Sequence, residues 1–155
     1  MRLYLARHGE AKRSDEDPER GLTDAGEDGV EKVSVAVSEA TTGARPERIL
    51  HSGKKRARQT AEILARGLGC GDVAETRGLA PNDDPGAWLG LPAGEGDLML
   101  VGHLPFMDRL ASLLVCDDAD RGAFAFVPAA VLCLESGESS SRWRVEWMVN
   151  PVIAG

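Results

Sequence analysis

The sequence has few features of a disulfide-stabilised, zinc-binding or membrane-inserted protein. It contains three cysteines, Cys70, Cys116 and Cys133, which are widely spaced and form no C-x-x-C pair. This pattern favours reduced thiols in a cytoplasmic protein over a disulfide framework or a zinc site. No apolar run approaches the roughly 20 residues of a membrane span. The N-terminus also lacks the hydrophobic region of a signal peptide, because charge returns at Arg7.

Positive charge is scarce as well. The chain has 18 Lys and Arg against 25 Asp and Glu, which gives a net charge of −7. This balance argues against non-specific binding to nucleic acid or to anionic membranes, both of which need a basic surface. Walker A, G-x-S-x-G and G-x-G-x-x-G sequences are absent, and the H-G-E at 8–10 has no P-C-x-x-C to make a zinc deaminase. An anionic substrate would therefore require positive charge concentrated at one place.

The length and composition predict one globular domain over residues 1–155. The chain is 43% hydrophobic and 28% charged, which is ordinary for a soluble protein, and it is long enough to bury its own core. No internal repeat is present, and no linker is long enough to divide the chain. The sequence does not indicate an oligomeric state.

Strands and helices are predicted to alternate over the first 115 residues. The patterns favour strands at 3–6, 48–51, 73–76 and 97–101, and helices after Thr23, at 54–68 and at 105–115, with one helical turn near 85–89. Two further strands at 130–135 and 143–148, joined by the polar S-G-E-S-S-S, predict a C-terminal hairpin. The alternation implies an α/β fold, a three-layer αβα sandwich around a mostly parallel sheet.

Three of the predicted strands end in unusual residues. The first is followed by Arg7-His8-Gly9, the second by His51-Ser52 with Arg56 one helical turn later, and the fourth by Gly102-His103. Because ligands of such sheets bind outside the carboxyl ends of the strands, these residues would share one cleft. Two imidazoles and two guanidiniums in one cleft are unfavourable unless an anion lies between them.

Each of these residues also has an ordinary interpretation. A lone histidine is usually a surface or core residue, and Gly102 could serve only a turn. Lys54, Lys55 and Arg58 are interpreted as the solvated face of the helix at 54–68. The functional interpretation rests on the coincidence that two of three histidines follow predicted strands directly and that one adjoins an arginine.

Four motifs in order resemble the histidine phosphatase (phosphoglycerate mutase-like) superfamily. They are L-A-R-H-G-E at 5–10, R-G-L-T-D-A-G at 20–26, S-G-K-K-R-A-R-Q-T at 52–60 and L-V-G-H at 100–103. The short chain, G-H-L-P-F at 102–106 and the C-terminal segment ending in Asn-Pro are similar to the SixA-type phosphohistidine phosphatases. One departure is Gly53, where the family often has proline after the serine.

The resemblance implies a phosphoglycerate mutase-like fold and a metal-independent, cofactor-free mechanism. His8 would be the nucleophile that forms a covalent phosphohistidine. Arg7 and Arg56 would grip the phosphoryl oxygens as planar forks, and His103 would complete the clamp. Ser52 and the start of the following helix would add to the phosphate site. Arg20 either joins this pocket or ties its own loop down in an ion pair.

The general acid of the wider superfamily has no clear counterpart. The available loop carboxylates are Glu75, Asp83, Asp84 and Glu95, and none stands out. An alkoxide leaving group needs a strong acid, whereas an imidazole leaving group that is already protonated does not. The lack of a clear general acid therefore favours a phosphohistidine protein as substrate. The alternatives are a phosphomonoesterase acting on a small phosphorylated metabolite, a phosphate-binding module with little turnover, and, with least support, a mutase.

Overall fold

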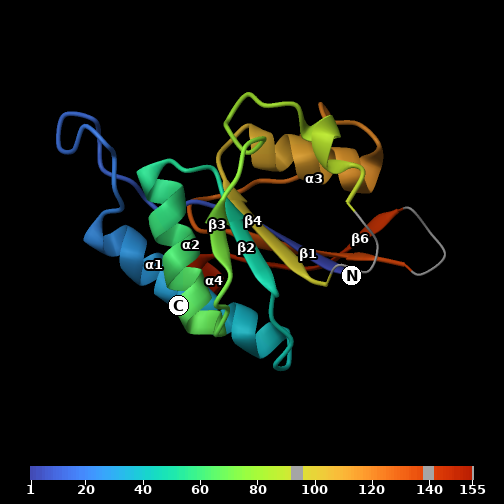
Figure 1. Cartoon of the computed structure of the whole chain (residues 1–155), viewed down its shortest axis with the longest axis horizontal. Coiled ribbons are helices and arrows are strands. Elements are labelled where there is room, and N and C mark those ends of the chain that lie inside the picture. The colour runs from blue at the N-terminus through green and yellow to red at the C-terminus, as the bar shows by residue number, and fades with distance from the viewer. Residues whose placement is uncertain (92–95, 138–141, 155) are drawn as a thin grey trace.

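A computed structural model describes residues 1–91, 96–137 and 142–154 (Figure 1). Its elements follow one another in the order β1 (Arg2–Arg7), α1 (Asp24–Ala40), β2 (Arg48–His51), α2 (Lys55–Leu68), β3 (Val73–Glu75), the 3-10 helix η1 (Pro85–Trp88), β4 (Leu98–Gly102), α3 (Phe106–Cys116), β5 (Val131–Ser136), β6 (Trp143–Val149) and α4 (Pro151–Ala154). The predicted alternation of strands and helices is thus confirmed.

The six strands form one mixed sheet in the order β3-β2-β4-β1-β5-β6. β1 and β2 both pair in parallel with β4, and β3 pairs in parallel with β2. β5 is antiparallel to β1 and to β6, as the predicted hairpin requires. The turn sequence proposed for that hairpin includes residues 138–141, which lie outside the described residues. The central strand β4 therefore lies between β2 and β1, and these three strands carry the predicted site residues.

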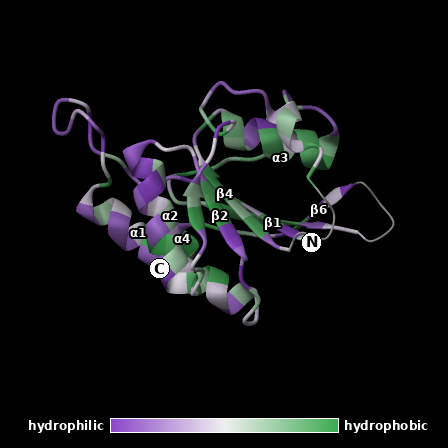
Figure 2. Ribbon diagram, viewed as in Figure 1, coloured by the Kyte–Doolittle hydropathy of each residue, from purple (hydrophilic) through white to green (hydrophobic). Residues whose placement is uncertain are grey.

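Alternate residues of the strands pack into two separate cores. In β1, Tyr4 and Ala6 face the core under α1 and α2, whereas Leu3 and Leu5 face the core under α3 and η1. Figure 1 shows α1 and α2 on one side of the sheet and α3 on the other, and Figure 2 shows the apolar central strands between these layers. Period-two alternation with apolar residues on both sides is the pattern of a sheet covered by helices on both faces. The predicted three-layer sandwich is confirmed.

The helix starts agree with the sequence in one case and differ in two. Thr23 caps α1, and its hydroxyl accepts a hydrogen bond from the Gly26 N–H at 2.9 Å. The helix predicted at 54–68 begins one residue later, and Lys54 is its N-cap without a side-chain cap bond, whereas Ser52 lies outside the helix. Pro105 was expected as the first residue of α3 and is instead its N-cap. The serine hydroxyl is engaged elsewhere, as described below.

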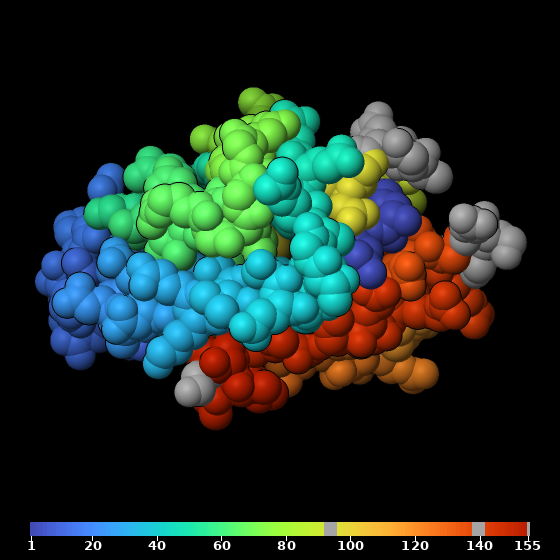
Figure 3. Space-filling model, turned by 90° about the horizontal axis from the view of Figure 1, so that it is seen from below, coloured from blue at the N-terminus to red at the C-terminus, as the bar shows by residue number. Residues whose placement is uncertain are grey.

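The C-terminal helix α4 was not predicted. It has four residues, too few for a periodic pattern, and the Asn150 side chain accepts hydrogen bonds from the N–H groups of Val152 and Ile153. In the space-filling view its residues, coloured red, lie against the blue of α1 (Figure 3). No helix within the described part of the chain is both long and apolar enough to cross a membrane.

Candidate active site

The parallel register brings three strand ends to one edge of the sheet. Arg7 pairs with Gly102 across β1 and β4, and His51 pairs with Val101 across β2 and β4. The residues that follow therefore meet: the His8 and His103 ring centroids lie 5.1 Å apart, and Ser52 Oγ lies 2.6 Å from His103 Nε2. The structure thus brings all three segments together, as the alignment of their strands predicts.

The hydrogen bond of His8 defines its tautomer. Its Nδ1 lies 2.7 Å from the Gly9 carbonyl oxygen, which can only accept, so Nδ1 carries the proton. In the neutral ring, Nε2 is then an unprotonated nitrogen with a free lone pair. This arrangement presents a nucleophile without any proton transfer.

Burial keeps this imidazole neutral. The His8 side chain is almost fully buried, and the loss of hydration is the main cause that lowers its pKa to about 4. The positive charges of Arg56, Arg7 and Arg20 lower the pKa further, while the bond to Gly9 opposes the shift. Burial is thus a larger cause of the neutral form than the neighbouring arginines.

His103 is also buried and neutral. Burial is again the main cause that lowers its pKa to about 3, and the charges of His8 and Arg56 lower it further. Its Nδ1 is buried without a hydrogen-bond partner among the described residues. A buried nitrogen of this kind is uncommon in proteins and indicates a position where a ligand or water completes the bonding.

Two half-buried guanidiniums surround the imidazoles and retain free donors. Arg7 donates from Nη1 to the Phe126 carbonyl at 2.8 Å, whereas the Nε groups of Arg7 and Arg56 are buried without a partner in the described chain. Burial lowers the pKa of both side chains, and Arg20 adds to the effect on Arg56. Guanidiniums without a counter-anion carry a desolvation cost that a tetrahedral oxyanion would relieve with bidentate hydrogen bonds.

Arg20 lies in the loop between β1 and α1. It is exposed, donates from Nε to the Lys12 carbonyl at 3.0 Å, and has no carboxylate partner among the described residues. Its charge contributes to the lowered pKa values of His8 and Arg56. Among the described residues Arg20 makes no ion pair, and its bond to the Lys12 carbonyl joins two residues of the same loop, so its place in the pocket stays a prediction.

Comparisons with known proteins identify the family of this chain. The model of the histidine phosphatase superfamily (branch 1) matches residues 3–96. A protein of Picosynechococcus sp. that is itself uncharacterised is 38% identical over 122 residues, which are 74% of this chain and 73% of that protein. The chain belongs to the histidine phosphatase superfamily.

Solved structures show the same fold. The protein histidine phosphatase SixA complexed with tungstate has a TM-score of 0.81 at 23% identity, with 98% of both chains covered. An Agrobacterium tumefaciens protein assigned as the phosphohistidine phosphatase SixA has a TM-score of 0.76 at 27% identity, with 96% of both covered. A mycobacterial glucosyl-3-phosphoglycerate phosphatase has a TM-score of 0.67 at 18% identity, covering 94% of this chain and 96% of that one.

Two residues of the motif at 52–60, Gln59 and Thr60, have no role predicted from the sequence. Thr60 accepts a hydrogen bond from the Gly9 N–H at 3.0 Å and donates to the Arg56 carbonyl at 2.8 Å. Gln59 accepts from the Leu22 N–H at 2.7 Å. Both side chains therefore fasten the loops after β1 to the first turns of α2, which fixes His8 relative to Arg56.

The loop before β5 also holds His8, and sequence reasoning missed it. The Ala129 N–H donates to the His8 carbonyl at 3.1 Å, and Phe126 supplies the carbonyl that binds Arg7. These backbone contacts involve no particular side-chain type, so no motif could have revealed them.

The Gly53 departure has a local explanation. Its φ of +89° is closed to proline, and its N–H donates to His51 Nδ1 at 3.1 Å, a bond that proline cannot make. The turn therefore has its own conformation here. It still presents Ser52 to His103, so no site residue is lost.

Three of the four carboxylates considered as general acid lie in the described chain, and all three line the groove that includes Ser52. Asp83 accepts from the Ala80 N–H and Asp84 accepts from the Gly86 N–H, both at 2.9 Å. The Glu75 side chain packs against Gly53, and its charge acts on His51. Glu95 lies outside the described residues. The expectation that none stands out agrees with these positions.

Lys54, expected on a solvated helix face, is exposed, yet its charge also contributes to the lowered pKa of His103. Its neighbours fit the original interpretation, since Lys55 pairs with Asp17 at 3.2 Å and Arg58 pairs with Glu62 at 3.8 Å. Lys54 therefore lies within electrostatic range of the active site.

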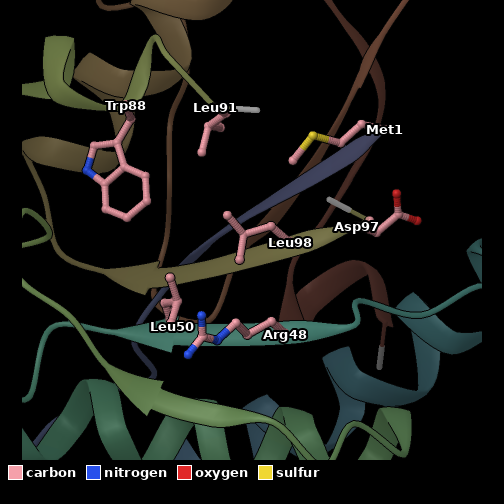
Figure 4. Close-up of a pocket in the computed structure, with 8 residues that line it drawn as sticks. Met1, Arg48, Leu50, Trp88, Leu91, Asp97 and Leu98 are labelled. Carbon is pink, nitrogen blue, oxygen red and sulfur yellow. The ribbon is translucent and has the colours of Figure 1, made fainter. Parts of the chain in front are cut away.

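The molecule is hollowed beside this site and also far from it. A groove of about 450 Å³ includes Ser52 and runs between the end of β3 and η1. A smaller pocket of about 190 Å³ lies where β1, β2 and β4 begin, between Trp88 and Leu98 (Figure 4). That pocket contains none of the predicted site residues. Within the described chain, no three His, Cys, Asp or Glu side chains cluster to hold a metal ion.

Proposed function

We propose that this protein is a phosphohistidine phosphatase that hydrolyses the phosphoryl group of a histidine-phosphorylated protein. The observation that carries the proposal is a buried, neutral His8 whose pKa is lowered by Arg56 and Arg7, two guanidiniums with buried Nε groups that have no partner among the described residues. A neutral imidazole is the form that can attack phosphorus, and fixed cations stabilise the charge on the equatorial oxygens.

The first step is phosphoryl transfer to the enzyme. His8 Nε2 forms a new N–P bond while the N–P bond of the substrate breaks, and the electron pair returns to the substrate ring. When the other ring nitrogen of that substrate already carries a proton, the leaving group departs as neutral imidazole. Arg7 and Arg56 would hold the phosphoryl oxygens throughout, and His103 would donate one hydrogen bond to them.

The second step is hydrolysis of the His8 intermediate. Water attacks phosphorus, the bond to Nε2 breaks, and both protons of the water leave with inorganic phosphate or with solvent. His8 departs as the same neutral tautomer that it had at the start, because the Gly9 carbonyl holds the Nδ1 proton in place. The resting site is thereby regenerated.

The leaving group explains the preference for phosphohistidine. A sugar alkoxide is a poor leaving group and needs a nearby acid, whereas Asp83 and Asp84 each accept a hydrogen bond from a backbone N–H and Glu75 packs against Gly53. His103 is a weak source of a proton as well, since its low pKa keeps it neutral. The SixA structure with tungstate, a tetrahedral oxyanion like phosphate, supports the same kind of pocket.

The test is a comparison of kcat/KM for free phosphohistidine, a phosphohistidine protein and a panel of sugar phosphates. We expect both phosphohistidine substrates to be turned over faster than every sugar phosphate. Faster turnover of the sugar phosphates would reverse the assignment. A rapid acid-labile phosphate assay on His8 after incubation with phosphoramidate separates an enzyme from a phosphate-binding module, and His8→Ala serves as the control without a nucleophile.

A phosphomonoesterase for small metabolites is the second candidate. The groove next to Ser52 contains Arg77, an exposed cation that makes no ion pair with the described residues and could contact a second anionic group. A glucosyl-3-phosphoglycerate phosphatase shares the fold. If this candidate is right, Arg77→Ala will raise the KM of a sugar phosphate and leave that of free phosphohistidine unchanged.

A further inference from the structure

The loop before β5, residues 117–130, contacts two residues of the proposed active site. Its Phe126 carbonyl accepts a hydrogen bond from Arg7 Nη1 at 2.8 Å, and its Ala129 N–H donates to the His8 carbonyl at 3.1 Å. The bond to Phe126 is the one side-chain hydrogen bond that Arg7 makes to the described residues. Because a guanidinium is a rigid plane, this single bond sets the direction of its other donors.

Two side chains of α3 fasten the same loop. Asp108 Oδ1 accepts hydrogen bonds from the Phe124 N–H at 3.0 Å and from the Ser112 hydroxyl at 3.1 Å. Ser112 Oγ in turn accepts from the Ala123 N–H at 3.1 Å, and Ser112 is completely buried. In Figure 1 the loop is the orange trace that leaves α3 and returns to the sheet. Two consecutive backbone N–H groups of the loop are therefore held by one pair of side chains on α3.

The Phe126 carbonyl lies between two fastened points of the loop. It follows Phe124, which is bonded to Asp108, by two residues, and it precedes Ala129, which is bonded to His8, by three. The Phe126 side chain is also buried, in the core under α3. A segment this short has little conformational freedom once both ends are fixed, so the position of the carbonyl depends on the bonds to α3.

The helix that fastens the loop also begins beside the site. The Met107 N–H donates to the His103 carbonyl at 2.9 Å, and Asp108 is the next residue of α3. His103 follows β4, whereas Arg7 ends β1, so α3 contacts the supports of two site residues that come from different strands. Movement of the loop relative to α3 would therefore move the Arg7 donors relative to His103.

We propose that Asp108 and Ser112 are positioning residues for Arg7. They hold the loop before β5 so that the Phe126 carbonyl aims the free donors of the guanidinium at a bound oxyanion. Both residues act through Arg7 and leave the chemistry to His8. The inference rests on the proposed function in one respect, because it takes Arg7 as a ligand of the phosphoryl group.

The experiment is a double-mutant cycle that follows the affinity for tungstate, the oxyanion in the SixA complex. Isothermal titration calorimetry gives the Kd for wild type, Arg7→Ala and Arg56→Ala, each with and without Asp108→Ala. If Asp108 acts through Arg7, its substitution loses its effect once the Arg7 guanidinium is gone. Arg56 is the matched background, because its guanidinium belongs to the same site but is carried by α2.

We expect Asp108→Ala to raise the Kd for tungstate about tenfold in the wild type and in Arg56→Ala, which corresponds to about 1.4 kcal/mol. In Arg7→Ala the same substitution should change the Kd by less than about twofold. Equal rises in all three backgrounds, or no rise in the wild type, would overturn the proposal. A residue that only stabilises the fold has no reason to act through one guanidinium.

Two variants serve as controls for Asp108→Ala. Asp108→Asn keeps an acceptor oxygen for the Phe124 N–H, so its Kd should stay within about threefold of the wild-type value. Asp120→Ala removes an exposed carboxylate of the same loop, which pairs with Arg109 of α3 at 3.4 Å, and it should leave the Kd unchanged. A loss in Asp120→Ala as large as the loss in Asp108→Ala would contradict a specific role of Asp108.

Ser112→Ala gives a second, milder cycle. It removes the acceptor of the Ala123 N–H and keeps the bond from Asp108 to Phe124, so the rise in Kd should be smaller and should again disappear in Arg7→Ala. This variant decides the question if Asp108→Ala does not fold, which urea denaturation shows. A rise that persists in Arg7→Ala would overturn the proposal here as well.

The failure of this inference and the failure of the proposed function give different results. Wild-type protein that binds tungstate and shows the expected cycle, but does not hydrolyse free phosphohistidine, would refute the proposed function and leave the positioning role in place. Wild-type protein that hydrolyses phosphohistidine but gives an additive cycle would refute the positioning role alone.

Discussion

Protonation of His8 should destabilise the folded protein, and this can be measured without knowing the substrate. Burial lowers the pKa of His8 from 6.5 to about 4. Between these values the unfolded chain binds more protons than the folded one, so the free energy of unfolding rises with pH. This stability is fully present above pH 6.5 and is lost as the pH falls toward 4. From these two pKa values, linkage gives a loss of about 2 kcal/mol at pH 5.

The measurement is urea denaturation at pH 7.5 and pH 5.0, in buffers without phosphate or sulfate, on wild type and His8→Asn. His103 adds a loss of the same sign in both proteins, because its pKa is also lowered. We therefore expect the wild type to lose about 2 kcal/mol more than His8→Asn between the two pH values. Equal losses in the two proteins would show that His8 titrates normally, and the argument for a buried neutral nucleophile would fail.

The remaining predictions concern the arginine clamp, its supports and metal dependence. Arg56→Lys keeps the charge and loses the planar fork, so kcat/KM for free phosphohistidine should fall on the order of 100-fold, while Arg58→Lys on the exposed face should change it little. Thr60→Val leaves the buried Gly9 N–H without its acceptor, so urea denaturation should show a loss of about 1–3 kcal/mol, and normal stability would contradict the positioning role. Turnover should be the same before and after dialysis against a chelator, and a loss restored by a divalent cation would show a metal requirement.

The convergence of the site could be predicted because parallel strands end at the same edge. Once the strands ending at Arg7, His51 and Gly102 are placed in one parallel sheet, the residues after them must meet. The register confirms this, and the distance between His8 and His103 follows from it. Local patterns of apolar residues were enough to reach this conclusion.

The supports of the site could not be predicted, because they depend on contacts between distant parts of the chain. Serine is a residue type that often caps helices, but the Ser52 hydroxyl bonds to His103, 51 residues away. The Arg7 guanidinium is held by a backbone carbonyl 119 residues away. Every residue has a backbone carbonyl, so the residue type at position 126 could not have predicted this contact. The helix α4 was not predicted for a different reason, because its four residues are too few to show a periodic pattern.

A single bound oxyanion would compensate all the unfavourable features of the site. Burial lowers the pKa of the His8 and His103 imidazoles. The guanidiniums of Arg7 and Arg56 have buried Nε groups without partners in the described chain. Each feature by itself would count against a stable fold, since buried polar groups are normally paired. A tetrahedral oxyanion between them would accept from the free guanidinium donors and would lie next to the unprotonated nitrogen of His8. The stability that these unpaired groups cost is therefore available for binding a phosphoryl group.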